Sequence, residues 1–245
     1  MSDRSWRWSP FLRVHGLLIP LGLILLANVL RFSGWDDRLT ALFFDPVAMT
    51  FPARDWPGLE RWGHHWAKTA VVCVWVGLLG AAVLAPKLPR LAPHRKLLWL
   101  TVAAMGLGPI LVTLIKDINT HDCPWNLKMF GGPDDYSAEW FVSRSRAGRC
   151  FPGGHAAGGF SVIALAFAAA ALGWVGRARG LLLLAIGVGL AFSAVRVVQG
   201  AHFVSHNLWS AAIDWAVAAW ILAPMMPADL TATLGRAQRT SGPHA

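Results

Sequence analysis

Six long apolar runs, separated by shorter polar segments, organise the chain. A helix needs about 20 consecutive, mostly apolar residues to cross the hydrocarbon core of a bilayer. Each run has about this length, provided that the first is extended through its flanks. We therefore predict an all-α protein, an integral membrane bundle of six transmembrane helices that forms a single domain over residues 1–245. The runs cover residues 17–30, 69–85, 97–115, 155–174, 180–198 and 207–226.

The composition agrees with a membrane protein. Hydrophobic residues make up 55% of the 245 residues and charged residues only 14%, a balance that suits a bilayer better than water. The first run follows the sequence RSWRWSPFLR and has no small-residue cleavage site, so we expect a retained helix rather than a secretory signal. An even number of spans then places both termini on one side of the membrane.

The basic residues bear on orientation and exclude one class of partner. The net charge of +9 comes from residues scattered at the ends of the runs, which is ordinary for a membrane protein and gives no nucleic-acid signal. Half of the 22 basic residues fall on each side, so the positive-inside rule alone is undecided. Five outer residues are also candidates for a functional cluster: Lys116, Arg144, Arg146, Arg149 and Arg196. Without them the excess lies on the terminal side, which predicts that residues 1–16 and 227–245 are cytoplasmic tails.

Three segments on the opposite, outer side carry unusual polar residues. They read LIKDINTHDCPWNL, CFPGGH and SAVRVVQGAHFVSHNLW, and each lies at the end of an apolar run. Because the three boundaries share one face of the membrane, a bundle can bring Lys116, His155, Arg196 and His202 together at one rim. The outer loop 116–154 then contributes to a site at the membrane surface.

This combination of residues suits a phosphate group. Lys116 offers a point charge and Arg196 a planar fork that can hold two oxygens. His155 and His202 can move a proton or attack phosphorus near neutral pH. The two glycines that precede His155 allow backbone amides at a helix start to approach an anion closely. We therefore expect a phosphate site at this rim.

The three segments resemble the three-part signature of the type 2 phosphatidic acid phosphatase superfamily. That signature is a lysine, six residues and Arg-Pro; then Pro-Ser-Gly-His; then Ser-Arg, five residues, histidine, three residues and aspartate. The resemblance covers the spans from about residue 97 to 226. In this chain the parts read Lys116 with Cys123-Pro124, then Pro152-Gly153-Gly154-His155, then Arg196 with His202 and His206.

The resemblance implies a role for each matching residue. His202 is similar to a nucleophile that becomes phosphohistidine, and His155 to the acid that protonates the leaving oxygen. Lys116 and Arg196 would hold the phosphate oxygens and stabilise the charge of the transition state. The resemblance implies no metal and no other cofactor. Two residues of the turn would add backbone amides: Gly153 and Gly154.

Several positions depart from the family pattern. Cys123 stands where the family has arginine, Gly153 replaces serine, and His206 replaces the aspartate that orients the nucleophile. A neutral His206 can accept the N–H of His202 from the same helix face; alternatively it is a helix-start residue facing water. Arg149 is favoured as the substitute cation, because it lies nearest the glycine turn among three candidates: Arg144, Arg146 and Arg149.

The cysteines predict a disulfide. Cys123 and Cys150 both lie in the outer loop, whereas Cys73 lies within the second apolar run. A periplasmic loop is in an oxidising compartment, where such a bridge forms and persists. A bond between Cys123 and Cys150 would tie the Lys116 segment to the His155 turn and set the distance between two halves of the phosphate site.

Other polar and aromatic residues leave alternatives open. Asp214 lies inside the sixth run, where it can pair with a basic group or stay protonated. The outer segment 31–68 has amphipathic pieces that can lie along the interface or form a simple loop, and its His64 and His65 are a weak metal signal. Three tryptophans are more typical of interface anchors than of ligand-stacking residues: Trp125, Trp140 and Trp209.

We therefore expect a membrane lipid phosphatase that acts through a phosphohistidine at the periplasmic face of a bacterial inner membrane. A site at the bilayer rim favours a lipid substrate, since a lipid can present its headgroup without leaving the membrane. The family implies undecaprenyl diphosphate, phosphatidylglycerol phosphate, phosphatidic acid or the phosphates of lipid A. Two alternatives remain open: a lipid phosphotransferase that uses the same site, and a lipid-phosphate binding or transport protein without catalysis.

Overall fold

A computed structural model describes residues 9–59, 61, 66–137 and 148–227 of the chain. Among these residues the regular elements are helical, and β structure is limited to two isolated bridges. Six helical segments are long and apolar enough to cross a membrane. They span Leu12–Phe32, Lys68–Lys87, Ala92–Ile118, Gly154–Ala171, Val175–Val198 and Val204–Met225. The prediction of an all-α membrane bundle is confirmed.

The helices follow one another through short connections. The π-helical turn Leu12–Leu18 leads into α1 (Ile19–Phe32), and the short α2 (Trp35–Ala41) comes next. α3 (Ala67–Leu84) and α4 (Arg95–Ile118) are joined through 3₁₀ turns at Ala85–Lys87 and Ala92–His94. Further 3₁₀ turns lie at Pro124–Asn126, Lys128–Phe130 and Ala223–Met225. The remaining helices are α5 (Gly154–Phe160), α6 (Ile163–Ala171), α7 (Val175–Val198) and α8 (Val204–Leu222).

The fourth apolar run forms two helices rather than one. The Ser161 hydroxyl donates to the Gly158 carbonyl oxygen at 2.7 Å, and the amide of Ala164 bonds three residues back, to the Ser161 carbonyl at 3.1 Å. A hydroxyl that occupies a helix carbonyl is a common cause of a bend or break. α7 also begins before its apolar run. Its first turns include the charged residues Arg177 and Arg179.

Glycines bring α5 close to α7. A Cβ atom on Gly159 of α5 would lie 2.8 Å from the Cα atom of Gly189 of α7, and a Cβ atom on Gly189 would overlap the ring of Phe160. Small residues allow the backbones of membrane helices to approach one another in this way. The contact holds α5, which carries His155, against α7, which carries Arg196.

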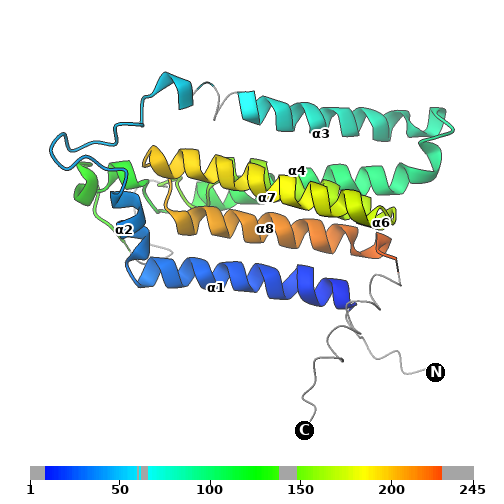
Figure 1. Ribbon diagram of the computed structural model, residues 1–245, viewed down its shortest axis with the longest axis horizontal. Coiled ribbons are helices and arrows are strands. Elements are labelled where there is room, and N and C mark those ends of the chain that lie inside the picture. The colour runs from blue at the N-terminus through cyan, green and yellow to red at the C-terminus, as the bar shows by residue number, and fades with distance from the viewer. Residues whose placement is uncertain (1–8, 60, 62–65, 138–147, 228–245) are drawn as a thin grey trace, which may run out of the picture.

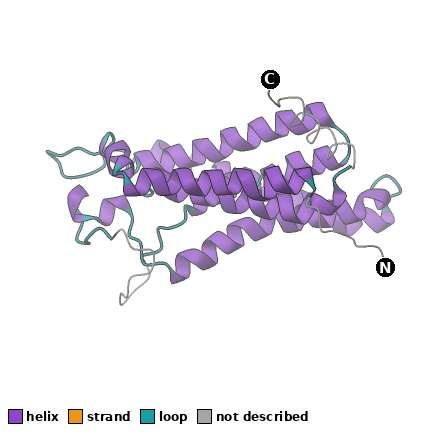
Figure 2. Cartoon of the chain, turned by 90° about the horizontal axis from the view of Figure 1, so that it is seen from below, coloured by secondary structure: helices purple, strands orange, loops and turns teal. Residues whose placement is uncertain are grey.

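α8 lies in the middle of the bundle in Figure 1, and Figure 2 shows the same bundle of helices from below. α8 packs most extensively against α1 and α4 and also contacts α5 and α6. The buried core beside it includes Phe11, Phe167 and Trp215. The ring centroids of Phe11 and Phe167 are 5.2 Å apart, and those of Phe167 and Trp215 are 6.2 Å apart, both in edge-to-face contact. The residues at the start of α8 are therefore fixed by a well-packed element.

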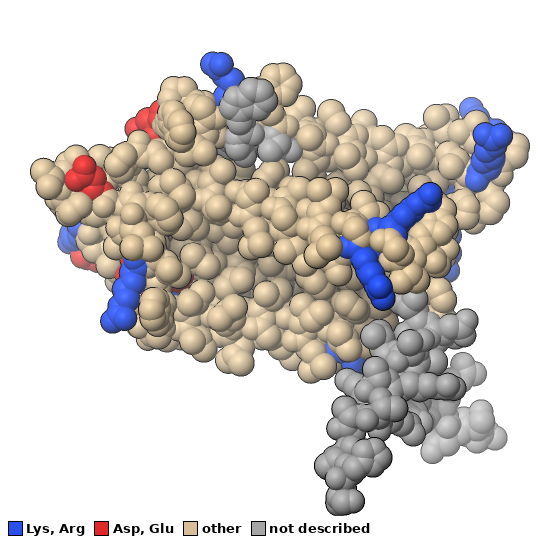
Figure 3. All heavy atoms as spheres, in the orientation of Figure 1, with Lys and Arg blue, Asp and Glu red and all other residues tan. Residues whose placement is uncertain are grey.

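The surface shows which part of the molecule faces lipid. Lysine, arginine, aspartate and glutamate lie toward the two ends of the visible face, with a mostly uncharged surface between them (Figure 3). Large apolar side chains are exposed along the helices, including Leu25 of α1, Val76 of α3 and Leu183 of α7. Such a continuous apolar surface is typical of contact with a bilayer. The chain is thus a multi-pass membrane protein, and both ends of its described part lie at the same end of the bundle (Figure 1).

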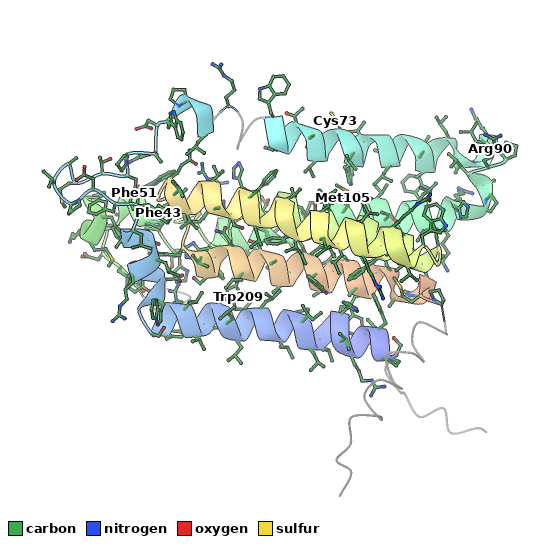
Figure 4. The ribbon with its side chains drawn as sticks, in the orientation of Figure 1. Phe43, Phe51, Cys73, Arg90, Met105 and Trp209 are labelled. Atoms are coloured by element: carbon green, nitrogen blue, oxygen red, sulfur yellow. A yellow bond between two sulfur atoms is a disulfide. The ribbon has the colours of Figure 1, made fainter. Side chains whose placement is uncertain are left out.

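The opposite end of the bundle is built from α2 and the loops. The buried carboxylate of Asp36 in α2 accepts a hydrogen bond from the amide of Ser205 at 3.0 Å. Asp36 thereby caps the N-terminus of α8 from a distant part of the chain. Phe51, Phe130 and Phe203 form a second apolar cluster at this end, where Phe51 is labelled in Figure 4.

The predicted disulfide between Cys123 and Cys150 is confirmed, and their Cα atoms are 5.1 Å apart. The amide of Cys150 also donates to the His121 carbonyl oxygen at 3.2 Å, which holds the two ends of the outer loop side by side. Cys73 is free and exposed on α3 (Figure 4). Other predictions concern residues outside the described part of the chain: Arg144, Arg146, Trp140, His64, His65 and the tail segments 1–8 and 228–245.

Candidate active site

A cavity of about 390 Å³ lies between α3, α4, α5 and α7. Lys116, in the last turn of α4, and His155, in the first turn of α5, both line it. Gly154 is part of the same lining, and a Cβ atom on this glycine would lie 3.3 Å from Nζ of Lys116. The Lys116 ammonium group therefore lies against the glycine turn that leads into His155.

His202 lies in the short turn between α7 and α8. Gly200 begins this turn with a positive φ of 70°, a conformation that glycine adopts without a steric cost. The amides of Ala201 and His202 donate to the carbonyl oxygen of Arg196 at 2.9 and 3.3 Å. A Cβ atom at Gly200 would overlap the Phe51 ring. The turn thus folds His202 back toward Arg196.

The surroundings of His202 define its tautomer. The side chain is buried, with a relative exposure of 3%, and its Nδ1 lies 2.8 Å from the carbonyl oxygen of Cys150. A carbonyl oxygen only accepts, so Nδ1 carries the proton and Nε2 carries the lone pair. Burial lowers the pKa of His202 well below its ordinary value, and the positive charges of Lys116 and Arg196 lower it further. A neutral imidazole with its lone pair on Nε2 is a nucleophile.

Arg196 lies in the last turn of α7 beside an aromatic platform. Its Nη1 donates to Oε1 of Gln199 at 2.8 Å, and its guanidinium carbon is 5.6 Å from the ring centroid of Trp125. The guanidinium carbon of Arg54 lies 4.7 Å from the same ring. Trp125, which the sequence favours as an interface anchor, therefore supports two arginines beside the site.

Gly153 has a packing role. Its amide donates to the His206 carbonyl oxygen at 3.0 Å, and its carbonyl oxygen accepts from the Ser210 hydroxyl at 2.8 Å. A Cβ atom on Gly153 would overlap the side-chain oxygen of Asn207. The Gly153 amide thus donates within the protein rather than to phosphate, which corrects the role expected for it. The same contacts give a physical reason for glycine where the family has serine.

His206 does not orient His202 through a hydrogen bond. Neither ring nitrogen of His206 meets a hydrogen-bond partner among the described residues, and its ring centroid is 6.0 Å from that of His202. The Cys150 carbonyl occupies the position that the sequence assigns to His206. The water-facing alternative is also wrong, since His206 is only 1% exposed and packs against the ring edges of Phe151 and Phe203.

Arg149 pairs with an acidic neighbour of the site. Its Nη2 lies 2.9 Å from Oδ1 of Asp117, and both side chains are exposed. Asp117 directly follows Lys116 in the chain, and the Arg149 charge is one of those that act on the Lys116 ammonium. The structure therefore places Arg149 at the edge of the site, although its guanidinium group forms an ion pair there.

A buried chain of hydrogen bonds supports the loop beside His206, and sequence reasoning missed it. Nη2 of Arg31 lies 2.5 Å from Nε2 of His121, and Nδ1 of His121 lies 2.6 Å from Oδ1 of Asn119. Because arginine only donates, Nε2 of His121 accepts and Nδ1 donates to the amide oxygen. Arg31 is 90 residues from His121 and has the sequence context of an ordinary interfacial cation, so the polar stretch THD was the only available signal.

Asp214 does not line the cavity that contains Lys116 and His155. It is buried on α8 opposite Gly108 of α4, where a Cβ atom would overlap the carboxylate. Of the two alternatives for Asp214, pairing with a basic group is not observed, because no donor among the described residues meets its oxygens. The described residues also contain no group of three or more His, Cys, Asp or Glu side chains that could hold a metal ion.

The polar segments of the site lie within a region of the chain that matches a known protein family. Residues 97–227, more than half of the chain, match the PAP2 superfamily. This range begins near the start of α4 and ends after α8, so it includes Lys116, His155, Arg196 and His202. Comparison with curated proteins and with solved structures finds no match. The match includes all three polar segments of the site. Together with the six membrane-spanning helices, it shows that the chain belongs to the PAP2 superfamily.

Proposed function

We propose that this protein is a lipid phosphatase that hydrolyses a membrane lipid phosphate or diphosphate through a phosphohistidine at His202. Membership of the PAP2 superfamily supports a phosphatase-type activity on lipid phosphates. The observation that carries the proposal is the 2.8 Å contact between Nδ1 of His202 and the carbonyl oxygen of Cys150, because it leaves the lone pair on Nε2. Lys116 and Arg196 supply positive charge close to this nitrogen.

In the first step, Nε2 of His202 forms a bond to phosphorus while the bond from phosphorus to the lipid oxygen breaks. His155 donates a proton to the departing lipid oxygen. Lys116 and Arg196 stabilise the negative charge on the other phosphate oxygens. Two further contacts to these oxygens are proposed at the edge of the site: the side chain of Arg149 and the amide of Gly154.

In the second step, water attacks the phosphohistidine. His155, which has lost its proton, accepts one from this water. The bond between phosphorus and Nε2 breaks, inorganic phosphate is released and His202 returns to its neutral form. His206 acts in neither step; it packs beside His202 and keeps the ring in place.

The lining of the cavity supports a lipid substrate. Val71 and Trp75 of α3, Met105 of α4 and Phe192 of α7 give it apolar walls, while Lys116 lies at the end where the outer loop begins. An acyl or prenyl chain would be buried against the apolar walls, with its phosphate at the cationic end. A water-soluble phosphate ester would make no use of these walls.

The proposed location is a bacterial inner membrane, with the site on the periplasmic side. The disulfide between Cys123 and Cys150 supports this side, since disulfides persist in the periplasm and are rare in the cytoplasm. A lipid phosphotransferase would use the same phosphohistidine with a second lipid in place of water. A protein that only binds lipid phosphate would have no use for the tautomer imposed on His202.

Phosphate release by purified protein tests the proposal. The substrates are undecaprenyl diphosphate, phosphatidylglycerol phosphate, phosphatidic acid and lipid A, each with and without an acceptor lipid. His202→Ala should abolish turnover, whereas His94→Ala, in an exposed 3₁₀ turn before α4, should leave it unchanged. Near-normal turnover by His202→Ala would contradict the mechanism. Phosphate transfer to the acceptor without release would favour the phosphotransferase.

A further inference from the structure

A second lysine lines the cavity that Lys116 and His155 share. Lys68 lies in the first turn of α3 and lines the cavity together with Lys116 and His155. α3 and α4 are antiparallel neighbours, so the start of α3 and the end of α4 lie at the same end of the bundle (Figure 1). Two lysines therefore line one cavity from two different helices.

Among the described residues, no aspartate or glutamate lines the cavity, and its other polar side chains include Thr113, Ser161 and His155. Asp117 follows Lys116 in the chain, but it is outside this lining and pairs with Arg149. Lys68 is exposed and forms no ion pair among the described residues. Two like charges that face the same space repel each other unless an anion lies between them. The arrangement is suited to an anion that reaches both lysines.

The proposed cleavage of one phosphate group already uses Lys116 and Arg196. Lys68 stands apart from them on α3, the helix whose Val71 and Trp75 line the wall proposed for the lipid chain. A group bound by Lys68 would therefore lie toward the α3 wall, on the side of the cleaved phosphate where the lipid chain is proposed to bind. In a lipid diphosphate, the phosphate attached to the lipid occupies this position.

We propose that Lys68 binds the phosphate that stays with the lipid, and that the site thereby prefers a lipid diphosphate over a lipid monophosphate. This inference rests on the proposed function and names its substrate class. Lys68 lies outside residues 97–227, the part of the chain that matches the PAP2 superfamily. The preference is therefore a property of α3 in this protein.

The chemistry gives Lys68 a reason to affect the rate. Nε2 of His202 bonds to the terminal phosphorus as the bond from this phosphorus to the bridging oxygen breaks. The bridging oxygen takes a proton from His155 and leaves as part of the lipid monophosphate, and water then releases inorganic phosphate from His202. The departing group gains negative charge during bond cleavage, and Lys68 stabilises it. A lipid monophosphate has no second phosphate for Lys68 to bind.

Kinetics on a matched pair of substrates test the inference. A prenyl diphosphate and the monophosphate of the same prenol are compared in the wild type and in Lys68→Met, which keeps an unbranched stem but removes the charge. Loss of one charge-assisted contact should lower kcat/KM for the diphosphate about tenfold and leave kcat/KM for the monophosphate almost unchanged. Lys68→Arg should retain most of the activity. Lys87→Met, at the opposite end of the same span, is the matched control.

Binding measurements separate this inference from the proposed reaction. A prenyl methylene-bisphosphonate and a prenyl phosphonate cannot be cleaved at the positions concerned, and their Kd values are measured with the same variants. Lys68→Met should weaken bisphosphonate binding alone. If the wild type cleaves neither lipid but shows this selective loss, the hydrolysis proposal fails and the assignment of Lys68 stands. An equal effect on both ligands, or no effect on the bisphosphonate, overturns the assignment.

Discussion

The carbonyl oxygen of Cys150 accepts a hydrogen bond from Nδ1 of His202 at 2.8 Å. The sulfur of the same cysteine is bonded to Cys123, so a covalent bridge constrains the backbone atom that orients the histidine. A carbonyl group fixes the tautomer and direction of an imidazole ring as a carboxylate does, but it adds no full negative charge. The hydrogen bond alone raises the pKa of His202, but burial and the charges of Lys116 and Arg196 lower it by more and keep the ring neutral, which is the nucleophilic form.

Removal of the disulfide should affect stability and turnover together. The bridge joins residues 27 apart in sequence, and a loop of this length corresponds to about 3 to 4 kcal/mol in the chain-entropy model. In the double variant Cys123→Ser with Cys150→Ser, the looser carbonyl should also misplace His202 and lower kcat about 10- to 100-fold. Chemical denaturation and turnover assays measure the two effects.

Cys73→Ser is the control for these cysteine variants, since Cys73 is exposed on α3 and should be neutral. Mass spectrometry of protein alkylated without reductant should find a label on Cys73 and none on Cys123 or Cys150. Labelling of both loop cysteines would contradict the bridge. Unchanged turnover in the double serine variant would show that the loop holds the Cys150 carbonyl in place without the disulfide.

His206→Asp should destabilise the protein, although it restores the residue of the family pattern. The side chain at this position is surrounded by the rings of Phe151, Phe203 and His202 and meets no hydrogen-bond partner among the described residues. A buried carboxylate without a donor costs several kcal/mol. Asparagine has nearly the same shape as aspartate but no charge. His206→Asn should therefore be more stable than His206→Asp and should keep most of the activity. Melting temperature and kcat of the pair measure the difference.

The opposite result would also be informative. If His206→Asp is as stable as the wild type and turns over faster, the new carboxylate has taken the N–H of His202 from the Cys150 carbonyl. A changed pH profile of the aspartate variant would accompany that exchange, because the carboxylate would stabilise the charged imidazole.

The sequence predicts the spans and the cations of the site better than it predicts the partners of the site histidines. Apolar length identifies the six spans, and spacing within the polar segments identifies Lys116 and His202. The Cys150 carbonyl is a backbone atom, which every residue possesses, so no side-chain pattern marks it as the acceptor. For this reason the prediction that His206 accepts the N–H of His202 was wrong. Arg149 shows a second limit, since it pairs with Asp117 and has a positive φ of 59°, and the sequence marks neither feature.

Gly153→Ser should lower stability through contact with Asn207. A Cβ atom at residue 153 would overlap the Asn207 side-chain oxygen, and the buried Asn207 side chain must shift, because the amide and the carbonyl group of Gly153 are hydrogen-bonded. Overpacking of this kind costs about 1 to 3 kcal/mol. Asn207→Ala removes the obstacle, so the double variant should be more stable than the sum of the two single changes predicts. Unfolding free energies of the four proteins give the coupling, and simple additivity would contradict the contact.

The pKa of His202 gives a pH dependence with a definite sign. Burial and the charges of Lys116 and Arg196 hold this pKa well below its ordinary value, so His202 should remain neutral as the pH falls through the usual range of histidine titration. In the unfolded chain the same residue takes up a proton near pH 6.5. Between these two pKa values the unfolded state binds more protons, so the contribution of His202 to the free energy of unfolding is complete above about pH 6.5 and is lost as the pH falls toward the folded value.

NMR titration of protein labelled with ¹⁵N-histidine follows this proton directly. The His202 resonance is identified as the one absent from His202→Gln, and it should show the neutral Nδ1–H tautomer throughout the pH range in which an unperturbed histidine titrates. In Lys116→Met the pKa of His202 should rise, because one of the two neighbouring charges that lower it is gone. Lys87→Met, far from the site, should not shift it. A His202 pKa at or above the ordinary value of histidine in the wild type would contradict this prediction, because the charged imidazole that it implies as the pH falls cannot attack phosphorus.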